Sequence, residues 1–323
     1  MPILLNEHDV RRFLPMADLI EAMEGALAAF STGQVRQPVR AIVELGTQGF
    51  FGVMPAALTS PAAAGVKIVT VMPRNHERGL PSHLATIMLM DAETGALDAI
   101  LDGRFITEAR TAAVSAVSAR HLARADSRIV AIIGSGVQAR SHAGALAHVL
   151  PSCEFRIWSP TPANRAAAAR EIAAATGRPA EASASAREAA DGADVVVLVT
   201  ASTEPVIESA WIRDDAHVIG VGACRPTERE MPAALVARAR LVVDSRDAAV
   251  KEAGDILLAR QDGVEAPISA ELGEICAGGA PGRAGADGVT VFKSLGLAVE
   301  DVVAARLVFD RARAAGAGAT IDL

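Results

Sequence analysis

A glycine pattern in the middle of the chain could hold the phosphates of a dinucleotide. Gly134, Gly136 and Ala139 follow the apolar run 129–133 in the order Gly-x-Gly-x-x-Ala. This order predicts a buried strand, a tight turn and a helix whose unpaired N–H groups attract a pyrophosphate. An isolated match can be a plain turn, but further strand–helix alternation follows this one. We therefore expect the turn Gly134-Ser135-Gly136 to bind a dinucleotide.

The end of the next expected strand bears on which dinucleotide binds. An enzyme that uses NAD commonly places Asp or Glu there, to bind the ribose 2′-hydroxyl. This sequence has Ser159 and Thr161 instead, followed by Arg165. A 2′-phosphate is then not repelled, which favours NADPH over NADH; the alternative is that Ser159 to Thr161 form only a turn and a helix cap. Thr200 closes the following crossover, where ligands bind in open α/β sheets.

Three cations stand in apolar surroundings within the first 110 residues. Arg40, Lys67 and Arg110 each interrupt a run of small or apolar residues. An unpaired buried charge costs several kcal/mol, so each must be paired or must face a site. With few acids nearby, we expect a pocket for a small anion, although a structural ion pair or an exposed edge is the alternative for each. Arginine suits a carboxylate, and a buried lysine can lose its proton, so we assign Arg40 and Arg110 to binding and Lys67 to proton transfer.

Other polar residues carry weaker signals. Ser82 and His83 could touch a nicotinamide or simply begin a strand. Asp102, Glu230 and Glu274 are the acids that we expect could orient the cations. We expect four further histidines to lie on the surface or on helix faces: His76, His121, His142 and His148.

The composition limits the possible classes of protein. The 323 residues are 51% hydrophobic, enough for two domains with large cores. A net charge of -7 without basic clusters argues against nucleic acid as a partner. Three scattered cysteines show no metal-ligand spacing and no disulfide framework, which indicates a reducing, cytoplasmic setting. Neither a signal peptide nor an apolar run of about 18 residues is present, so we expect neither secretion nor membrane insertion.

The order of apolar patterns predicts two domains. Residues 1–34 have helical spacing, and short apolar runs over 35–102 predict an antiparallel sheet of five or six strands. After a helix over 104–124, strands and helices alternate, which predicts a parallel sheet covered on both faces. The expected fold class is α/β, with a Rossmann-type doubly wound parallel sheet and an α+β domain with a mostly antiparallel sheet. We expect the α+β domain at 1–120 and 295–323 and the dinucleotide-binding domain at 121–294.

Segments along nearly the whole chain resemble the ornithine cyclodeaminase and mu-crystallin family, most of all its ketimine reductases of the mu-crystallin type. Their number and common order make the resemblance specific for the family, although not for the substrate. The segments that carry it are Gln37 to Arg40, Gly52 to Ala56, Pro81 to His83, Arg110 to Ala116, Gly134 to Ala139, Gly222 to Pro226, Val243 to Ser245, Lys251 to Asp255, Ala270 to Glu274 and Val291 to Gly296.

The resemblance implies a homodimer whose amino-terminal sheet and last helix form the interface. It also implies a nicotinamide cofactor on the Gly134 turn and a substrate carboxylate held by the positions of Arg40, Lys67 and Arg110. Further positions match residues near the cofactor in the family: Ser82, His83, Thr111, Val137, Gln138, Ser294 and Leu295.

One position departs from the cyclodeaminase pattern. Ornithine cyclodeaminases carry an aspartate where Cys224 stands, and that carboxylate handles the distal amine of the substrate. Without it, reduction of a preformed cyclic ketimine is the leading expectation, with 1-pyrroline-2-carboxylate or 1-piperideine-2-carboxylate giving proline or pipecolate. The alternatives are an ornithine cyclodeaminase, an alanine dehydrogenase, or an NADPH-dependent protein that binds a small ligand without turnover.

Overall fold

The chain divides into two compact units. The structure is a computed structural model that describes residues 1–46, 49–60, 62–284 and 288–322. Unit 1 comprises residues 1–110 and 296–323, and unit 2 comprises residues 111–295. The first junction falls inside helix α3 (Gly103–Leu122), whereas the sequence suggested residue 120. Within the described ranges, no helix combines the length and the apolar character that crossing a membrane requires.

Unit 1 is built on a mostly antiparallel sheet. Its strand order is β16-β1-β7-β6-β5-β4-β2, and β3 also pairs with β4. The described residues thus form eight strands, more than expected, because short strands near both termini and β2 extend the sheet. The strands are β1 (Ile3–Leu5), β2 (Val35–Arg36), β3 (Ala41–Glu44), β4 (Phe50–Thr59), β5 (Ala62–Val71), β6 (His83–Met90), β7 (Leu97–Asp102) and β16 (Ala319–Thr320).

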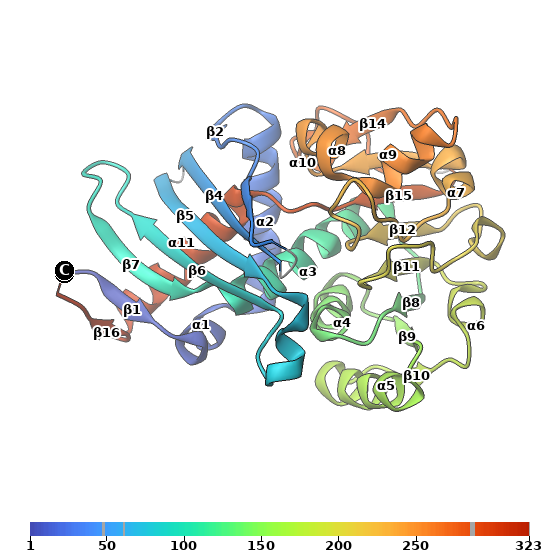
Figure 1. The fold of residues 1–323 in the computed structure, drawn as a ribbon, viewed down its shortest axis with the longest axis horizontal. Coiled ribbons are helices and arrows are strands. Elements are labelled where there is room, and N and C mark those ends of the chain that lie inside the picture. The colour runs from blue at the N-terminus through green and yellow to red at the C-terminus, as the bar shows by residue number, and fades with distance from the viewer. Residues whose placement is uncertain (47–48, 61, 285–287, 323) are drawn as a thin grey trace. The chain divides into compact units, whose positions relative to one another are not determined.

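Helices cover one face of this sheet. Helix α11 (Ala298–Ala314) packs on β4, β5 and β6 and against α2 (Met16–Ser31), as Figure 1 shows. The apolar side chains of α2 that recur at helical spacing are buried, including Leu19, Met23 and Leu27. Two shorter helices complete the unit, α1 (Glu7–Phe13) and the 3₁₀ turn η1 (Pro73–Arg78). The last helix therefore returns to the first sheet and brings its own side chains against it.

Unit 2 contains an eight-stranded parallel sheet in the order β10-β9-β8-β11-β12-β15-β13-β14. The order runs in opposite directions on the two sides of β8, so the switch point at which such sheets bind ligands lies next to it. The expected fold class is confirmed. The strands are β8 (Ile129–Ile133), β9 (Glu154–Trp158), β10 (Ala180–Ala182), β11 (Val195–Leu198), β12 (His217–Gly220), β13 (Arg240–Val243), β14 (Ile268–Glu271) and β15 (Thr290–Lys293).

Short, Ala-rich helices cover the parallel sheet. In Figure 1, α4 and α5 lie on one side of the sheet and α6 and α7 on the other. Small buried side chains such as Ala139 and Ala189 let these helices approach the strands closely. The helices are α4 (Val137–Val149), α5 (Pro162–Thr176), α6 (Ala186–Ala190), α7 (Ala233–Arg238), α8 (Arg246–Glu252), α9 (Gly254–Gln261) and α10 (Leu272–Cys276), with the 3₁₀ turn η2 (Ser209–Trp211).

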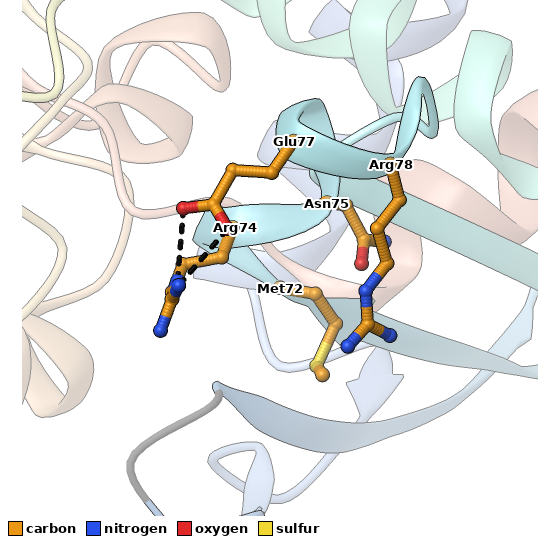
Figure 2. Close-up of a pocket in the computed structure, with 5 residues that line it drawn as sticks. All are labelled: Met72, Arg74, Asn75, Glu77 and Arg78. Carbon is orange, nitrogen blue, oxygen red and sulfur yellow. Dashed lines mark hydrogen bonds and ion pairs between the residues drawn. The ribbon is translucent and has the colours of Figure 1, made fainter.

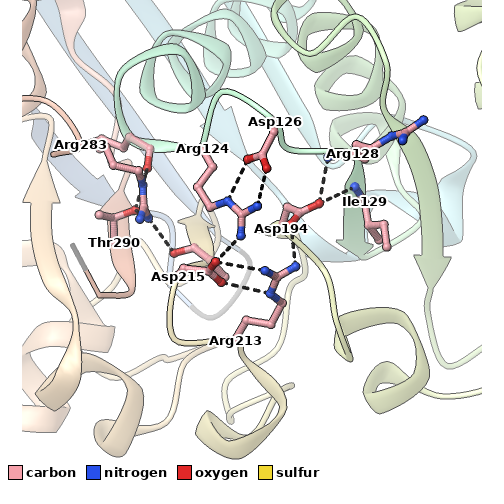
Figure 3. Close-up of polar contacts among 11 residues, drawn as sticks. Arg124, Asp126, Arg128, Ile129, Asp194, Arg213, Asp215, Arg283 and Thr290 are labelled. Atoms are coloured by element: carbon pink, nitrogen blue, oxygen red, sulfur yellow. Dashed lines mark hydrogen bonds and ion pairs between the residues drawn. The ribbon is translucent and has the colours of Figure 1, made fainter. Parts of the chain in front are cut away.

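A network of ion pairs joins the amino ends of β8 and β11 (Figure 3). One carboxylate oxygen of Asp194 accepts hydrogen bonds from the N–H groups of Arg128 and Ile129, at 2.8 and 2.9 Å. The other oxygen pairs with Arg213 at 2.8 Å, and Arg213 also pairs with Asp215. These residues lie at the edge of the sheet opposite the glycine turn. The network therefore holds strands together and does not belong to the ligand edge.

Two buried histidines link α3 to the parallel sheet and to α4. His142 Nδ1 lies 2.8 Å from the carbonyl oxygen of Gln138, and Nε2 lies 2.9 Å from Ser115 Oγ. His217 bridges Thr290 Oγ1 and Ser118 Oγ. Burial lowers the pKa of His142 to about 4 and that of His217 to about 3. Both rings are therefore neutral at pH 7. His142 lies on a face of helix α4, as one of the two expectations stated, but that face is buried, so the expectation of a surface position is wrong.

These histidines predict a loss of stability in mild acid. The unfolded chain binds protons on both near pH 6.5 while the folded protein does not, so the stability that they contribute is lost as the pH falls from 6.5. Between pH 7 and 5.5 we expect a loss of roughly 1 kcal/mol for each. In urea unfolding, the stability advantage of the unaltered protein over His142→Gln should shrink by that amount, because other titrating groups are common to both proteins. A constant difference between the unaltered protein and His142→Gln over this pH range would contradict the assignment.

Candidate functional site

The glycine turn has the geometry that a pyrophosphate needs. Gly134 has φ +130°, and a Cβ atom there would lie 2.6 Å from the carbonyl oxygen of Val199. A Cβ atom at Gly136 would meet nothing within 4 Å, so this side of the turn is open. Helix α4 begins directly after Gly136, and no described side chain caps its first N–H groups. The residues present therefore fit a dinucleotide phosphate, with Ser135, Val137 and Gln138 beside the open turn.

The end of β9 lies next to this turn. The N–H of Gly134 donates to the carbonyl oxygen of Trp158 at 2.8 Å. Ser159 is buried, and its carbonyl oxygen accepts from Arg165 Nη1 at 3.0 Å. Thr161 is the residue before α5, but its hydroxyl makes no capping hydrogen bond to the helix. The alternative in which Thr161 serves only as a helix cap would have its hydroxyl make such a bond. The stretch from Ser159 to Arg165 contains no carboxylate, and the Oγ atom of Ser159 is buried.

Other expected cofactor contacts fall at the same edge of the parallel sheet. Thr200 follows β11, and Ser294 follows β15, where its N–H donates to the carbonyl oxygen of Gly220 at 2.9 Å. The N–H of Leu295 donates to Asp244 at 2.5 Å. Thr111 is buried on α3, where its carbonyl oxygen accepts from Ser115. Since the carboxyl ends of parallel strands share one edge, the structure brings the glycine turn, Thr200 and Ser294 to one side of unit 2.

The cations of unit 1 meet two carboxylates from the first turn of α11. Lys67 is 2% exposed, and its Nζ lies 2.5 Å from Asp301 Oδ2. Arg110 pairs with Asp301 through Nε at 3.1 Å and with Glu300 through Nη1 at 2.6 Å. The expectation of few nearby acids is therefore wrong. The pairing could not be predicted from the sequence because about 190 to 235 positions separate these partners. In addition, acids in the first turn of a helix are common because they stabilise the helix dipole, so Glu300 and Asp301 did not indicate a site.

The acids that the sequence suggested have other partners. Asp102 accepts from the N–H of Phe105 and so caps the start of α3. Glu274 pairs with Arg246 in unit 2, and Glu230 lies in unit 2 as well. Chain proximity and residue type could not distinguish these acids from Glu300 and Asp301. Only the return of α11 to the first sheet selects the latter pair.

Arg40 joins the cluster from the start of an exposed strand. It precedes β3, whose four residues are all exposed, as in the exposed-edge alternative. Its Nη2 donates to the carbonyl oxygen of Gly296 at 3.1 Å. The Arg110 guanidinium also lies against Gly296, where only a glycine with φ +85° leaves room for it. Gly296 thus brings the two guanidinium groups together.

The cluster is electrostatically unusual. It brings three cations and two carboxylates together, and Lys67, Arg110, Glu300 and Asp301 among them are buried. Burial, with Arg110 and Arg40 nearby, lowers the pKa of Lys67 to about 8, although Asp301 opposes this effect. Lys67 is therefore protonated at neutral pH but can release its proton readily. Such a cluster can hold an anion and supply a proton beside it.

His83 belongs electrostatically to this cluster. It begins β6, as one of the two sequence interpretations suggested. Burial, followed by the charges of Lys67 and Arg110, lowers its pKa to about 4. The neighbouring Ser82 is exposed, and its carbonyl oxygen accepts from the N–H of Met72. Both residues lie in unit 1, and the neutral His83 ring adds a polar group to the cluster without adding charge.

A separate small cavity of about 180 Å³ lies at η1 (Figure 2). Arg74, which lines it, makes two hydrogen bonds to Glu77, at 2.9 and 3.0 Å. Asn75 donates to the carbonyl oxygen of Pro81, and Met72 and Arg78 complete the lining. Arg74 and Glu77 are about half exposed or more, so water screens their charges. The cavity lacks the buried charges that distinguish the Lys67 cluster.

Comparisons with known proteins agree with this architecture. The sequence profile of the ornithine cyclodeaminase/mu-crystallin family matches residues 1–316. The ketimine reductase mu-crystallin of Rattus norvegicus is 42% identical over 314 residues, 96% of this chain and 97% of the relative. A Delta(1)-pyrroline-2-carboxylate reductase of Bacillus cereus is 33% identical over 324 residues, 99% of each chain.

Solved structures give the same result. Thermococcus litoralis Delta(1)-pyrroline-2-carboxylate reductase, in complex with NADH and L-proline, superposes with a TM-score of 0.96 at 38% identity, over 99% of this chain and 100% of the other. An archaeal alanine dehydrogenase dimer with bound NAD has a TM-score of 0.92 at 30% identity, over 100% and 99%. With the family profile spanning nearly its whole length, this chain belongs to the ornithine cyclodeaminase/mu-crystallin family.

Proposed function

We propose that this protein reduces a cyclic ketimine carboxylate, 1-pyrroline-2-carboxylate or 1-piperideine-2-carboxylate, to proline or pipecolate. Reductases match the chain over nearly its whole length, and the chain is accordingly an oxidoreductase that acts on C=N bonds. The observation that carries the substrate proposal is the cationic cluster, in which the buried Lys67 and Arg110 both pair with Asp301 and Arg40 adds a third positive charge.

Each member of the cluster has a distinct role in this proposal. Arg40 and Arg110 bind the carboxylate of the substrate, and Arg110 uses Nη2 because Nε and Nη1 already bind carboxylates. Lys67 Nζ gives a proton to the imine nitrogen, directly or through water, and Asp301 keeps Nζ protonated and oriented. Protonation makes the adjacent carbon a better hydride acceptor. The reduced nicotinamide, when bound at the Gly134 turn, supplies the hydride.

The region around Cys224 favours reduction over cyclodeamination. Cys224 is half-buried after β12, and its Sγ lies 3.3 Å from the carbonyl oxygen of Val221. A thiol there provides no carboxylate for a second ammonium group. A preformed cyclic imine has no such group, so its reduction loses nothing by this substitution.

NADPH is the cofactor that we propose, with NADH as the second choice. The end of β9 offers Ser159, Thr161 and Arg165 and has no carboxylate that would repel a 2′-phosphate. The solved relatives named above hold NADH or NAD, so the preference of this chain needs its own measurement.

One screen tests the reaction and the cofactor. Oxidation of NADPH and NADH is followed separately with the five-membered imino acid, the six-membered imino acid, and pyruvate with ammonia. We expect a cyclic imine to react at least about tenfold faster than pyruvate with ammonia, and NADPH to be preferred. Turnover confined to pyruvate and ammonia would indicate an alanine dehydrogenase. Ammonia release from ornithine without net NADH change would indicate a cyclodeaminase.

We also propose that the protein is a homodimer formed through the edge of its first sheet. Strand β3 pairs only with β4 among the described strands, and all of its residues are exposed. Ile42 is 44% exposed and Val43 55%, with Leu45 exposed beside them. An uncovered apolar edge strand favours pairing with another chain, and a second copy is the occupant that the alanine dehydrogenase dimer supports.

A charge on this edge is expected to yield monomers. Val43→Asp places a carboxylate in the apolar patch, and burying that charge in an interface costs several kcal/mol. Light scattering after size exclusion should give the mass of one chain, about 33.3 kDa, instead of two. The control is Val250→Asp, since Val250 is 46% exposed in unit 2. A dimeric Val43→Asp variant, or a monomeric unaltered protein, would contradict the proposal.

A further inference from the structure

Glu230 is a buried acid at the ligand edge of the parallel sheet that the proposed reaction does not use. It is 0% exposed and lies in the connection between β12 and α7. Its Oε1 accepts two hydrogen bonds from Thr200, from the backbone N–H and from Oγ1, both at 2.7 Å. The carbonyl oxygen of Glu230 also accepts from the N–H of Val206. One side chain and its backbone thus fix the start and the middle of the loop that follows β11.

Two further buried charges hold Glu230 in place. Asp255 Oδ1 accepts hydrogen bonds from the N–H groups of Glu230 and Met231, at 2.7 and 2.8 Å. Lys293, on β15, pairs with Asp255 Oδ2 at 3.1 Å and donates to the carbonyl oxygen of Gly222. Asp255 and Lys293 are both 0% exposed. A continuous set of buried contacts therefore connects the carboxyl ends of β15, β12 and β11.

The loop after β12 packs directly on this acid. A Cβ atom at Gly222 would lie 2.5 Å from both Glu230 Oε2 and the carbonyl oxygen of Thr200. The next residue, Ala223, has φ +55°. Among the described residues other than glycine, Ala223 alone has this left-handed backbone conformation, which is strained. Strain of this kind persists where the surrounding contacts determine the backbone. Here those contacts come from Glu230 and Lys293.

The charges around Glu230 make its carboxyl group unusual. Burial raises its pKa to about 7, while Lys293 and the hydrogen bonds from Thr200 oppose the rise and Asp255 adds to it. Its second oxygen, Oε2, is buried and has no hydrogen-bond partner among the described residues. A buried carboxylate oxygen without a hydrogen-bond partner lowers the stability of the folded protein, which is not expected of a residue with a purely structural role. Its position at the ligand edge suggests a reason.

The course of a dinucleotide across the sheet locates this cluster. The residues that would meet the adenosine ribose follow β9, on one side of the switch point at β8. The nicotinamide half then extends over the other side, where β11 and β12 end. The glycine turn is already packed against this region, because Gly134 lies against the carbonyl oxygen of Val199, the residue before Thr200.

We propose that Glu230 is a positioning residue for the nicotinamide half of the cofactor, and that Asp255 and Lys293 hold it in that role. Glu230 fixes the Thr200 loop and the Gly222 backbone in the arrangement that receives the nicotinamide riboside. The inference rests on the proposed dinucleotide site at the Gly134 turn. It predicts that Glu230 affects recognition of the nicotinamide half but not of the adenosine half.

Binding measurements separate the two halves. The ligands are NADPH or NADH, whichever binds the unaltered protein more tightly, and the ADP-ribose with the matching 2′ group, which lacks nicotinamide. We expect Glu230→Ala to weaken binding of the reduced dinucleotide at least about tenfold and to leave ADP-ribose binding within about twofold. Glu230→Gln keeps an oxygen that can accept from Thr200, so it should restore most of the affinity. Thr200→Val removes only the hydroxyl donor. It should also weaken binding of the reduced dinucleotide relative to binding of ADP-ribose, as Glu230→Ala does.

The outcomes distinguish the two proposals. An unaltered protein that binds neither ligand overturns the dinucleotide site itself. Equal weakening of both ligands in Glu230→Ala, or no rescue by Glu230→Gln, overturns the positioning role and leaves the site intact. If Glu230→Ala does not fold, an unchanged ratio of the two affinities in Thr200→Val overturns the positioning role by itself.

Discussion

Replacing Lys67 with alanine should lower kcat for imine reduction by about 10³-fold while the affinity for the reduced dinucleotide stays unchanged. The magnitude follows from the usual contribution of a positioned general acid, about 10² to 10⁴. The described hydrogen bond of Lys67 is to Asp301 and not to the glycine turn, so the substitution should leave the phosphate-binding turn unchanged. Steady-state kinetics gives the first quantity and the quenching of nicotinamide fluorescence the second.

Two further measurements distinguish proton transfer from simple charge. In the unaltered protein, kcat/KM for imine reduction should fall as the pH rises through about 8, because Lys67 then loses the proton that it must donate. Lys67→Arg keeps a positive charge beside Asp301 but does not release a proton at this pH, so it should be nearly as inactive as Lys67→Ala. Lys251→Ala, at an exposed lysine of α8, is the control and should retain full activity. An active Lys67→Arg enzyme would leave Lys67 with a purely electrostatic role.

The second large effect is expected for Asp301→Asn. Asp301 is 0% exposed and pairs with both Lys67 and Arg110. Removing its charge leaves two buried cations with Glu300 as their remaining carboxylate from α11, and breaking a buried pair in this way costs about 3–5 kcal/mol. We expect a loss of that size in the free energy of unfolding of unit 1, measured by urea titration.

The same variant should alter the pH dependence of catalysis. Asp301 raises the pKa of Lys67, so its neutralisation should move the fall in kcat/KM to a pH below 8. The matched control is Asp310→Asn on the same helix, since Asp310 is 53% exposed in its pair with Arg306. Exposed pairs contribute about 0–1 kcal/mol, so this control should be almost neutral. Equal stability losses for the two variants would contradict the assignment of Asp301 as the centre of the cluster.

Local sequence patterns determined the fold class and the glycine turn. The apolar run before Gly134 forms β8, and the order Gly-x-Gly-x-x-Ala forms the turn and α4, because strand propensity, glycine conformation and helix packing all act over a few neighbouring residues. The three cations could also be recognised from sequence, since a charge in an apolar run needs a partner or a site. The family could be inferred in the same way, from motifs in a common order.

Only the tertiary structure decided what surrounds those residues. The partners of Lys67 and Arg110 are Glu300 and Asp301, which reach the first sheet because α11 packs back on β4, β5 and β6. Glu230 has its role at the end of β11 because a loop between β12 and α7 returns to Thr200. Hydrophobic periodicity states which face of a helix is buried, but it does not state against which strand. The strand against which a helix packs determines which distant charges can pair, and that strand is selected only by the packing of the whole chain.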